Sequence, residues 1–243
     1  MRLDLSSQIV LDRVPQRYYR PENEFEQSAL TRYEKVPTNI HESSVEASFQ
    51  IAKDIAAKIK AKQKKGENFV LGLPGGQSPQ TIYTELIRYH KEGLSFSNVL
   101  VFNIYEFYPL INQSNSNLKL LKEYFLDHVD IAPENIYSPD GSIPKEEILN
   151  YCREYEQTIQ RVGGIDYLLL GLGRAGNIGI NIAGSSMTSQ TRLVLLDIQS
   201  KKEAINTFGS LDLVPPSAVT VGISTIMKAK EISLIAWGED KAG

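Results

Sequence analysis

Short apolar runs alternate with amphipathic or mixed segments along most of this chain. The runs expected to form strands span residues 69–73, 99–102, 165–170, 193–196, 218–222 and 232–237. Because such runs contain few polar positions, we expect strands that are covered on both faces. The alternation predicts an α/β fold: a doubly wound, mostly parallel sheet with helices on both faces. Ligands of such sheets bind in the loops that follow the carboxyl ends of the strands.

The clearest predicted helix begins after residue 43. Ser43-Ser44-Val45-Glu46 resembles a capping box, and Gly66 is suited to end the helix. Its apolar face is predicted to contain Val45, Phe49, Ala52, Ile55, Ala56 and Ile59. The residues before it are rich in charge, tyrosine and proline and show no sustained period. We therefore expect an irregular N-terminal arm over residues 1–42, packed on one domain over residues 43–243.

Length and composition exclude several classes of protein. A chain of 243 residues can bury one sizeable core. A formal net charge of -3 offers no electrostatic footprint for nucleic acid, which we do not expect as a partner. The single cysteine, Cys152, excludes an intrachain disulfide and a cysteine zinc cluster, and fits a reducing compartment.

We also expect no membrane partner. No apolar stretch approaches the roughly 20 residues that span a bilayer, and the N-terminus lacks the plan of a signal peptide. A cytoplasmic location is the expectation. The sequence ends at Gly243, directly after an apolar run where a doubly wound domain normally adds a covering helix. An additional C-terminal domain in the natural chain is therefore a further expectation.

A glycine-rich loop follows the first predicted strand. Pro74-Gly75-Gly76-Gln77-Ser78-Pro79 leads into a predicted helix from Gln80 to about Lys91, with Ser78 as its N-cap and Pro79 at its first position. Glycines allow close approach of a ligand, and free N–H groups at a helix start favour a phosphate. The alternative is a tight turn that binds nothing, and this loop alone does not decide between the two.

A second loop, Gly171-Leu172-Gly173-Arg174-Ala175-Gly176, matches the dinucleotide pattern G-x-G-x-x-G, and Asp197 lies near the offset of the acidic residue that binds ribose. The match is weak, because the true pattern occupies the first strand-to-helix turn of a nucleotide-binding unit. Dinucleotide binding is the less favoured interpretation. We expect no cofactor and no metal.

Several segments together resemble the glucosamine-6-phosphate deaminase/isomerase family in their order and spacing. They are residues 71–79, 102–107, 127–136, 171–173, 185–192 and 220–222, and the closing Lys241. The resemblance runs from about Ser43 to the end. It implies a Rossmann-like fold of the sugar-phosphate isomerase type, a phosphorylated amino sugar as the ligand, and a homo-oligomer as a candidate assembly.

The resemblance implies a phosphate site and further substrate contacts. In the family, the first glycine loop and a lysine after the last strand hold the phosphate. The matching positions are Gly75, Gly76, Ser78 and Lys241, and Gln77, Gly173 and Arg174 are further substrate-binding candidates. The family also uses an arginine in the segment that corresponds to residues 199–208. That segment has no arginine here, and Lys201 or Lys202 is the candidate substitute.

The acid and base positions of the family are mostly replaced. The catalytic Asp, Asp, His and Glu correspond to Tyr105, Ala175, Asn177 and Ile182. A phenol with a pKa near 10 is a poor base at neutral pH. Glu106 is adjacent, but neighbouring side chains of an extended segment point to opposite faces, so it does not simply take over the role. The histidines lie elsewhere, at positions 41, 90 and 128, and offer no obvious replacement.

Three hypotheses follow from the resemblance. The first is a sugar-phosphate-binding domain with weak or lost deaminase activity and a regulatory or scaffolding role. The second is an active amino-sugar-phosphate deaminase/isomerase that works through Tyr105, Glu106 and Arg174. The third, and least favoured, is a hydrolase like 6-phosphogluconolactonase, because the second loop again has no histidine.

Overall fold

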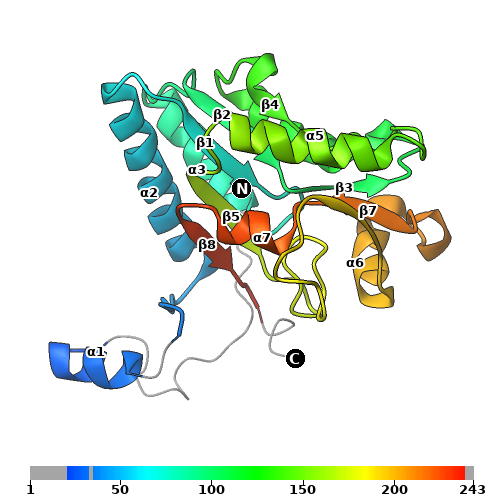
Figure 1. Ribbon diagram of the computed structural model, residues 1–243. Coiled ribbons are helices and arrows are strands. Elements are labelled where there is room, and N and C mark those ends of the chain that lie inside the picture. Colours follow the sequence, from blue (N-terminus) through cyan, green and yellow to red (C-terminus); the bar gives the residue numbers. More distant parts are fainter. Residues whose placement is uncertain (1–20, 33–34, 239–243) are drawn as a thin grey trace.

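The computed structural model describes residues 21–32 and 35–238 (Figure 1). Its central sheet is parallel and has the strand order β4-β2-β1-β5-β8. The strands are β1 (Phe69–Leu73), β2 (Val99–Asn103), β4 (Ile136–Tyr137), β5 (Tyr167–Gly171) and β8 (Ile232–Ile235). The α/β fold predicted from the alternating pattern is thus confirmed.

Helices cover both faces of this sheet (Figure 1). One face packs against α2 (Ser44–Lys64), α3 (Gln80–Lys91) and α4 (Asn117–Tyr124), and the other against α5 (Ile148–Arg161) and α7 (Ile223–Met227). Successive side chains of a strand point to opposite faces. Accordingly, Leu71 belongs to the first core cluster and Val70 to the second, and both are buried. The apolar runs of the sequence are explained by this double coverage.

A second, antiparallel sheet was not predicted. It has the order β3-β7-β6, built from β3 (Tyr105–Tyr108), β7 (Ser217–Thr220) and β6 (Arg192–Leu195), and α6 (Ile198–Phe208) packs on it. The expectation that every apolar run is covered on both faces is wrong for β6, since Leu195 is 77% exposed. Apolarity alone does not specify the direction in which a strand pairs. A single residue separates the end of β2 from the start of β3, so the sequence shows no clear boundary between the two sheets.

The predicted start and end of α2 are confirmed. The Ser43 Oγ accepts a hydrogen bond of 3.1 Å from the Glu46 N–H, and Gly66 adopts a φ of +66° after the last turn. The Glu46 carboxylate accepts from the N–H of Glu42, at 3.2 Å. The two contacts provide partners for backbone N–H groups at the start of α2 and just before it.

The prediction of an irregular arm is wrong over part of residues 1–42. The segment contains a helix, α1 (Glu24–Thr31), whose N-cap Asn23 accepts from the N–H of Glu26. Figure 1 shows α1 apart from the sheet and its helices. The sequence did not predict this helix because, at 8 residues, it is too short for a helical period to stand out. Residues 1–20 and 33–34 of the arm lie outside the described residues.

The strand order places a crevice beside β1. From β1 the chain proceeds to β2 and β4 on one side, and returns to β5 and β8 on the other. Loops that follow β1 and β5 therefore diverge, which is the usual position of a ligand site in such sheets. Short 3-10 helices complete the loops: η3 (Gln113–Asn115), η4 (Leu126–His128), η5 (Pro133–Asn135) and η6 (Leu211–Leu213). Within the described ranges, none of the helices has the length and apolarity needed to cross a bilayer.

Candidate functional site

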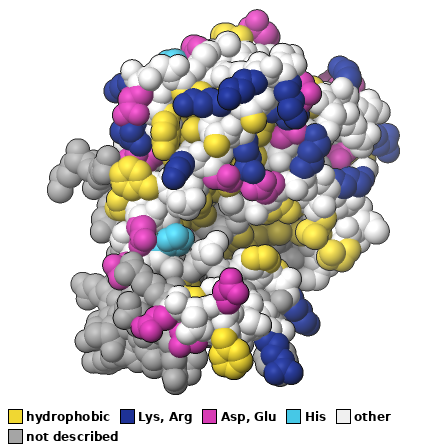
Figure 2. Space-filling model, turned by 90° about the vertical axis from the view of Figure 1, so that its left-hand side faces the viewer, with side chains coloured by type: hydrophobic (Ala, Val, Ile, Leu, Met, Phe, Trp, Pro, Cys, Tyr) yellow, Lys and Arg dark blue, Asp and Glu magenta, His cyan; other side chains and the backbone are white. Residues whose placement is uncertain are grey.

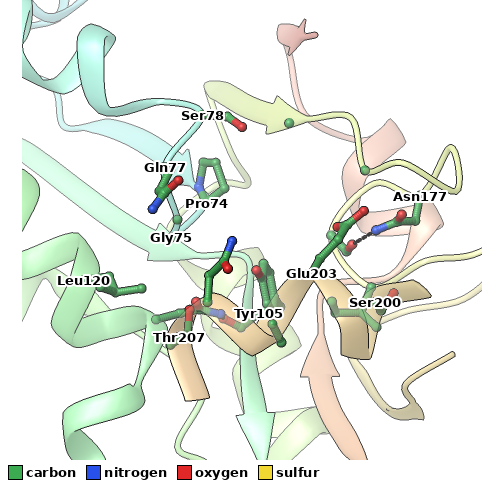
Figure 3. Close-up of a pocket in the computed structure, with 18 of the residues that line it drawn as sticks. Pro74, Gly75, Gln77, Ser78, Tyr105, Leu120, Asn177, Ser200, Glu203 and Thr207 are labelled. Atoms are coloured by element: carbon green, nitrogen blue, oxygen red, sulfur yellow. Dashed lines mark hydrogen bonds between the residues drawn. The ribbon is translucent and has the colours of Figure 1, made fainter. Parts of the chain in front are cut away.

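A pocket of about 860 Å³ opens at the carboxyl edge of the parallel sheet, where the strand order reverses (Figure 3). Its walls come from the loops after β1 and β5, the start of β3, one side of α4, one side of α6 and the residue Trp237 after β8. Both glycine loops of the sequence meet here. The structure therefore brings together segments that are about 100 positions apart in the chain.

The first glycine loop presents its backbone to this pocket. The N–H groups of residues 75–78 make no hydrogen bond to any other part of the described chain. Carbonyl groups of the same loop are held: the Tyr83 hydroxyl donates to Pro74 O at 2.6 Å, and the Trp237 indole donates to Ser78 O at 2.8 Å. Buried or half-buried N–H groups normally have partners. A row of donors on an anchored loop is thus available to an anionic ligand.

The predicted capping of α3 needs a correction. The helix does run from Gln80 to Lys91, but its N-cap is Pro79, and no side chain caps it. Ser78 instead lies one position earlier and lines the pocket. The loop makes one extra turn, with the Gln80 N–H donating to Gln77 O at 3.1 Å, and this shifts the cap by one residue.

Glycine is required at position 75 because helix α4 approaches the loop closely. A Cβ at Gly75 would lie 2.9 Å from the Cβ of Asn117, which is tighter than real contacts allow. Asn117 in turn donates from its Nδ2 to Tyr105 O at 3.2 Å. One asparagine therefore joins the first loop to the start of β3 on the floor of the pocket.

The second glycine loop folds back on itself and does not begin a helix. An antiparallel bridge joins Leu172 to Ile178, and the Gly173 N–H donates to Asn177 O at 2.9 Å. The Asn177 side chain is buried under Gly173 and donates to Gly179 O at 2.9 Å, as drawn in Figure 3. A dinucleotide fingerprint requires a helix at this point.

Asp197 is likewise engaged in a different role from the one that a dinucleotide site needs. Its carboxylate caps α6 by accepting from the N–H groups of Gln199 and Ser200, at 2.8 and 3.0 Å. Three observations, the absent helix, the folded loop and this cap, speak against the dinucleotide interpretation, which the sequence already disfavoured.

Tyr105 and Glu106 point in opposite directions, as expected for consecutive residues of a strand. Tyr105 lines the pocket, and burial raises the pKa of its phenol to about 12, so it is a neutral donor near pH 7. Glu106 is buried behind the pocket wall and is not among the lining residues. Its carboxylate accepts from the N–H groups of Asn117 and Leu118, at 3.0 and 3.1 Å.

Glu106 therefore serves as a buried anchor for the start of α4. Burial raises the pKa of its carboxyl to about 7, although backbone hydrogen bonds act in the opposite sense. Because Glu106 does not reach the pocket, the hypothesis of catalysis through Tyr105, Glu106 and Arg174 loses its carboxylate.

The remaining candidates are divided between the pocket and the surface. Gly76, Gln77, Gly173 and Arg174 line the pocket, whereas Ala175 and Ile182 are exposed and do not. The turn that follows Gly173 carries those two positions outward. Lys241 lies outside the described residues.

Two lysines of α6 were candidate phosphate ligands, and their positions differ. Lys202 lines the pocket, and its neighbour Lys201 does not. A helix turns by about 100° per residue, so consecutive residues face different sides. The pair therefore offers a matched comparison on one helix.

Several lining residues were missed from the sequence. They include Leu120 and Tyr124 on α4, Glu203 and Thr207 on α6, and Trp237. A signal for α6 did exist: Asp197 suits an N-cap, and positions 199, 203 and 207 follow at helical spacing. For α4 no comparable signal identified the side that would face a ligand.

The pocket has a simple charge pattern. Of the described residues that line it, Arg174, Lys202 and Glu203 carry charge, and none is histidine. Amides and hydroxyls supply the other polar groups. No cluster of three or more potential metal ligands of the His, Cys, Asp and Glu types occurs among the residues that the structure describes.

Comparison with known proteins agrees with this geometry. The signature of the family described as glucosamine-6-phosphate isomerases/6-phosphogluconolactonase matches residues 42–243. A glucosamine-6-phosphate deaminase-like protein of Bacteroides thetaiotaomicron is 57% identical over 100% of this chain, but the chain spans only 37% of that relative's length. A glucosamine-6-phosphate deaminase of Oceanobacillus iheyensis is 42% identical over 71% of this chain and 69% of its own length.

Solved structures extend the comparison to three dimensions. The structure of a monomeric glucosamine-6-phosphate deaminase is 37% identical, covers 79% of this chain and 78% of its own, and has a TM-score of 0.74. The 6-phosphogluconolactonase of Trypanosoma brucei covers 85% of this chain and 84% of its own with a TM-score of 0.67, but at 20% identity it shows the fold alone. The chain belongs to the glucosamine-6-phosphate isomerase/6-phosphogluconolactonase family.

Proposed function

We propose that this protein binds a phosphorylated amino sugar in the pocket beside β1 and has weak or lost deaminase activity. The observation that carries the proposal is the row of N–H groups at residues 75–78: they have no partner in the described chain and belong to a loop that lines a pocket whose described lining contains no histidine. Amide donors at a helix start suit a phosphate, whether or not the chemistry of the family survives.

The lining supports binding more strongly than it supports catalysis. Isomerisation with loss of ammonia needs ring opening and proton transfer between neighbouring carbons, both assisted by positioned acids and bases. The positions that supply these groups in the family are here a phenol with a pKa of about 12, a buried asparagine and two exposed apolar residues. Of these groups only the phenol of Tyr105 is placed to hydrogen-bond a sugar, and none of them serves as a proton-transferring acid or base near pH 7.

The role in the cell follows from binding without turnover. A domain that binds a sugar phosphate without converting it is suited to regulation or scaffolding. In a longer natural chain, the bound ligand would regulate the activity of an additional C-terminal domain. The division into an arm over residues 1–42 and a domain from residue 43, and a homo-oligomeric state, remain part of this proposal. Lys241 remains the candidate for the second phosphate ligand.

The experiment that tests the proposal is calorimetric titration with glucosamine 6-phosphate. We expect binding with a Kd below about 1 mM, and a weakening of roughly 3- to 10-fold in Lys202→Ala, because one partly solvated charge beside a phosphate contributes about 1 kcal/mol.

The matched control is Lys201→Ala, which removes the same charge from the same helix outside the pocket lining. Its affinity should stay within about twofold of the unchanged protein, a difference of less than about 0.5 kcal/mol. Absence of binding at millimolar ligand would contradict the proposal. Equal losses of affinity in the two variants would show that the phosphate does not bind beside the α6 side of the pocket.

A further inference from the structure

Glu203 is a carboxylate to which the resemblance assigns no role. It lies on α6 and lines the pocket together with two cationic residues, Arg174 and Lys202. Among the described lining residues it carries the only negative charge. A carboxylate in a site for a phosphate dianion repels that ligand. We therefore ask which other group of the ligand the carboxylate would attract.

The position of Glu203 is fixed by the second glycine loop. Its Oε1 accepts a hydrogen bond of 3.0 Å from the backbone N–H of Arg174. Figure 3 shows Glu203 rising from α6 toward the pocket, on a different wall from Gln77 and Ser78. The loop amides and the carboxylate thus lie at different parts of one cavity. A ligand that fills it meets donors at one part and an anion at another.

The carboxylate is also close enough to influence the pocket floor. Burial is the main cause of the raised pKa of Tyr105, and the charge of Glu203 adds to it in the same direction. Both side chains line the same pocket. A cation placed beside Glu203 would be stabilised by its carboxylate.

We propose that Glu203 selects phosphorylated sugars that carry a free amino group, by pairing with the ammonium form of that amine. The inference rests on the proposed function and adds a specificity-determining residue to it. An amine flanked by electron-withdrawing groups resembles a chain N-terminus, whose pKa of about 7.7–8.0 leaves it largely protonated near pH 7. A neutral sugar phosphate offers only a hydroxyl at the same place, and the hydrogen bond to a carboxylate is then weaker.

Glu203→Gln separates the charge from the structural contact. A glutamine keeps an oxygen that can accept from the Arg174 N–H, so the loop stays anchored, but the negative charge is gone. Two ligands serve as probes: glucosamine 6-phosphate and glucose 6-phosphate, which differ in one amino group against one hydroxyl. Calorimetry at about pH 6.5, below the pKa range of such an amine, gives four affinities for the two proteins.

The unchanged protein should bind the amino sugar phosphate roughly 10-fold more tightly than glucose 6-phosphate, the difference between a charge-assisted and a neutral hydrogen bond. In Glu203→Gln this preference should fall below about twofold, because binding of glucosamine 6-phosphate weakens while that of glucose 6-phosphate stays equal or improves. Retained binding of glucose 6-phosphate also shows that the variant is folded.

The possible failures are distinguishable. An unchanged protein that binds both sugar phosphates equally, or a Glu203→Gln variant that keeps the preference, overturns this inference and leaves the proposed function standing. An unchanged protein that binds neither ligand overturns the proposed function, and this inference with it.

Discussion

Purified protein supplied with saturating glucosamine 6-phosphate should release ammonia at least about 10⁴-fold more slowly than the Oceanobacillus deaminase. One positioned acid or base contributes roughly 10²–10⁴-fold to such a reaction, and several positions are replaced together in this chain. Their effects do not simply multiply, because groups that act as a unit are lost as a unit. A coupled assay of ammonia, run on both proteins at equal concentration, measures the ratio.

The competing hypothesis of an active enzyme makes the opposite prediction. It requires turnover within about 100-fold of the control enzyme, a loss no larger than one positioned group explains. Since Glu106 lies behind the pocket wall, Tyr105→Phe is the sharper variant with which to test it. Turnover of that size which disappears in Tyr105→Phe would contradict the proposal of weak or lost activity.

Gly76→Ala should weaken binding of glucosamine 6-phosphate by roughly 10- to 100-fold, since a displaced loop loses at least one charge-assisted hydrogen bond of about 1.5–3 kcal/mol. Gly76 has a φ of +97°, where a side chain is strained although no atom lies within 4 Å of the position that its Cβ would take. The strain moves the N–H groups that we assign to the phosphate. Calorimetric titration measures the change in affinity.

Gly93→Ala is the matched control. Gly93 has a φ of +101° and equally free space around its Cβ position, but it lies in the turn that ends α3. Both variants should lower the free energy of unfolding by roughly 1–2 kcal/mol, the cost of a left-handed residue. Only Gly76→Ala should lose affinity. Equal affinities of the two variants for glucosamine 6-phosphate would show that the first glycine loop is not part of the binding site.

The parts of the fold that depend on local chemistry are predictable from the sequence. Helix α2 is expected because its apolar positions recur at helical spacing between a serine cap and Gly66. Strand β1 is expected because its apolar run is bounded by Gly66 and Pro74. The second sheet was missed because short strands such as β6 and β7 carry no mark of their partner or its direction.

For the candidate site, the sequence indicates the loops but not all of the residues around them. Both glycine loops and Tyr105 line one pocket because they follow strands of one sheet. Glu203 and Asn117 were missed, since their role depends on how α6 and α4 lean against those loops. That packing depends on contacts between segments that are distant in the sequence, and such contacts cannot be predicted from a local pattern of residues.

A crystal structure of the protein with glucosamine 6-phosphate would show directly whether the first glycine loop holds the phosphate. We expect an intact sugar phosphate in the pocket beside β1, with phosphate oxygens about 2.7–3.2 Å from N–H groups of residues 75–78. A phosphate bound elsewhere on the molecule, or an empty pocket in crystals soaked at saturating ligand, would rule out this mode of binding.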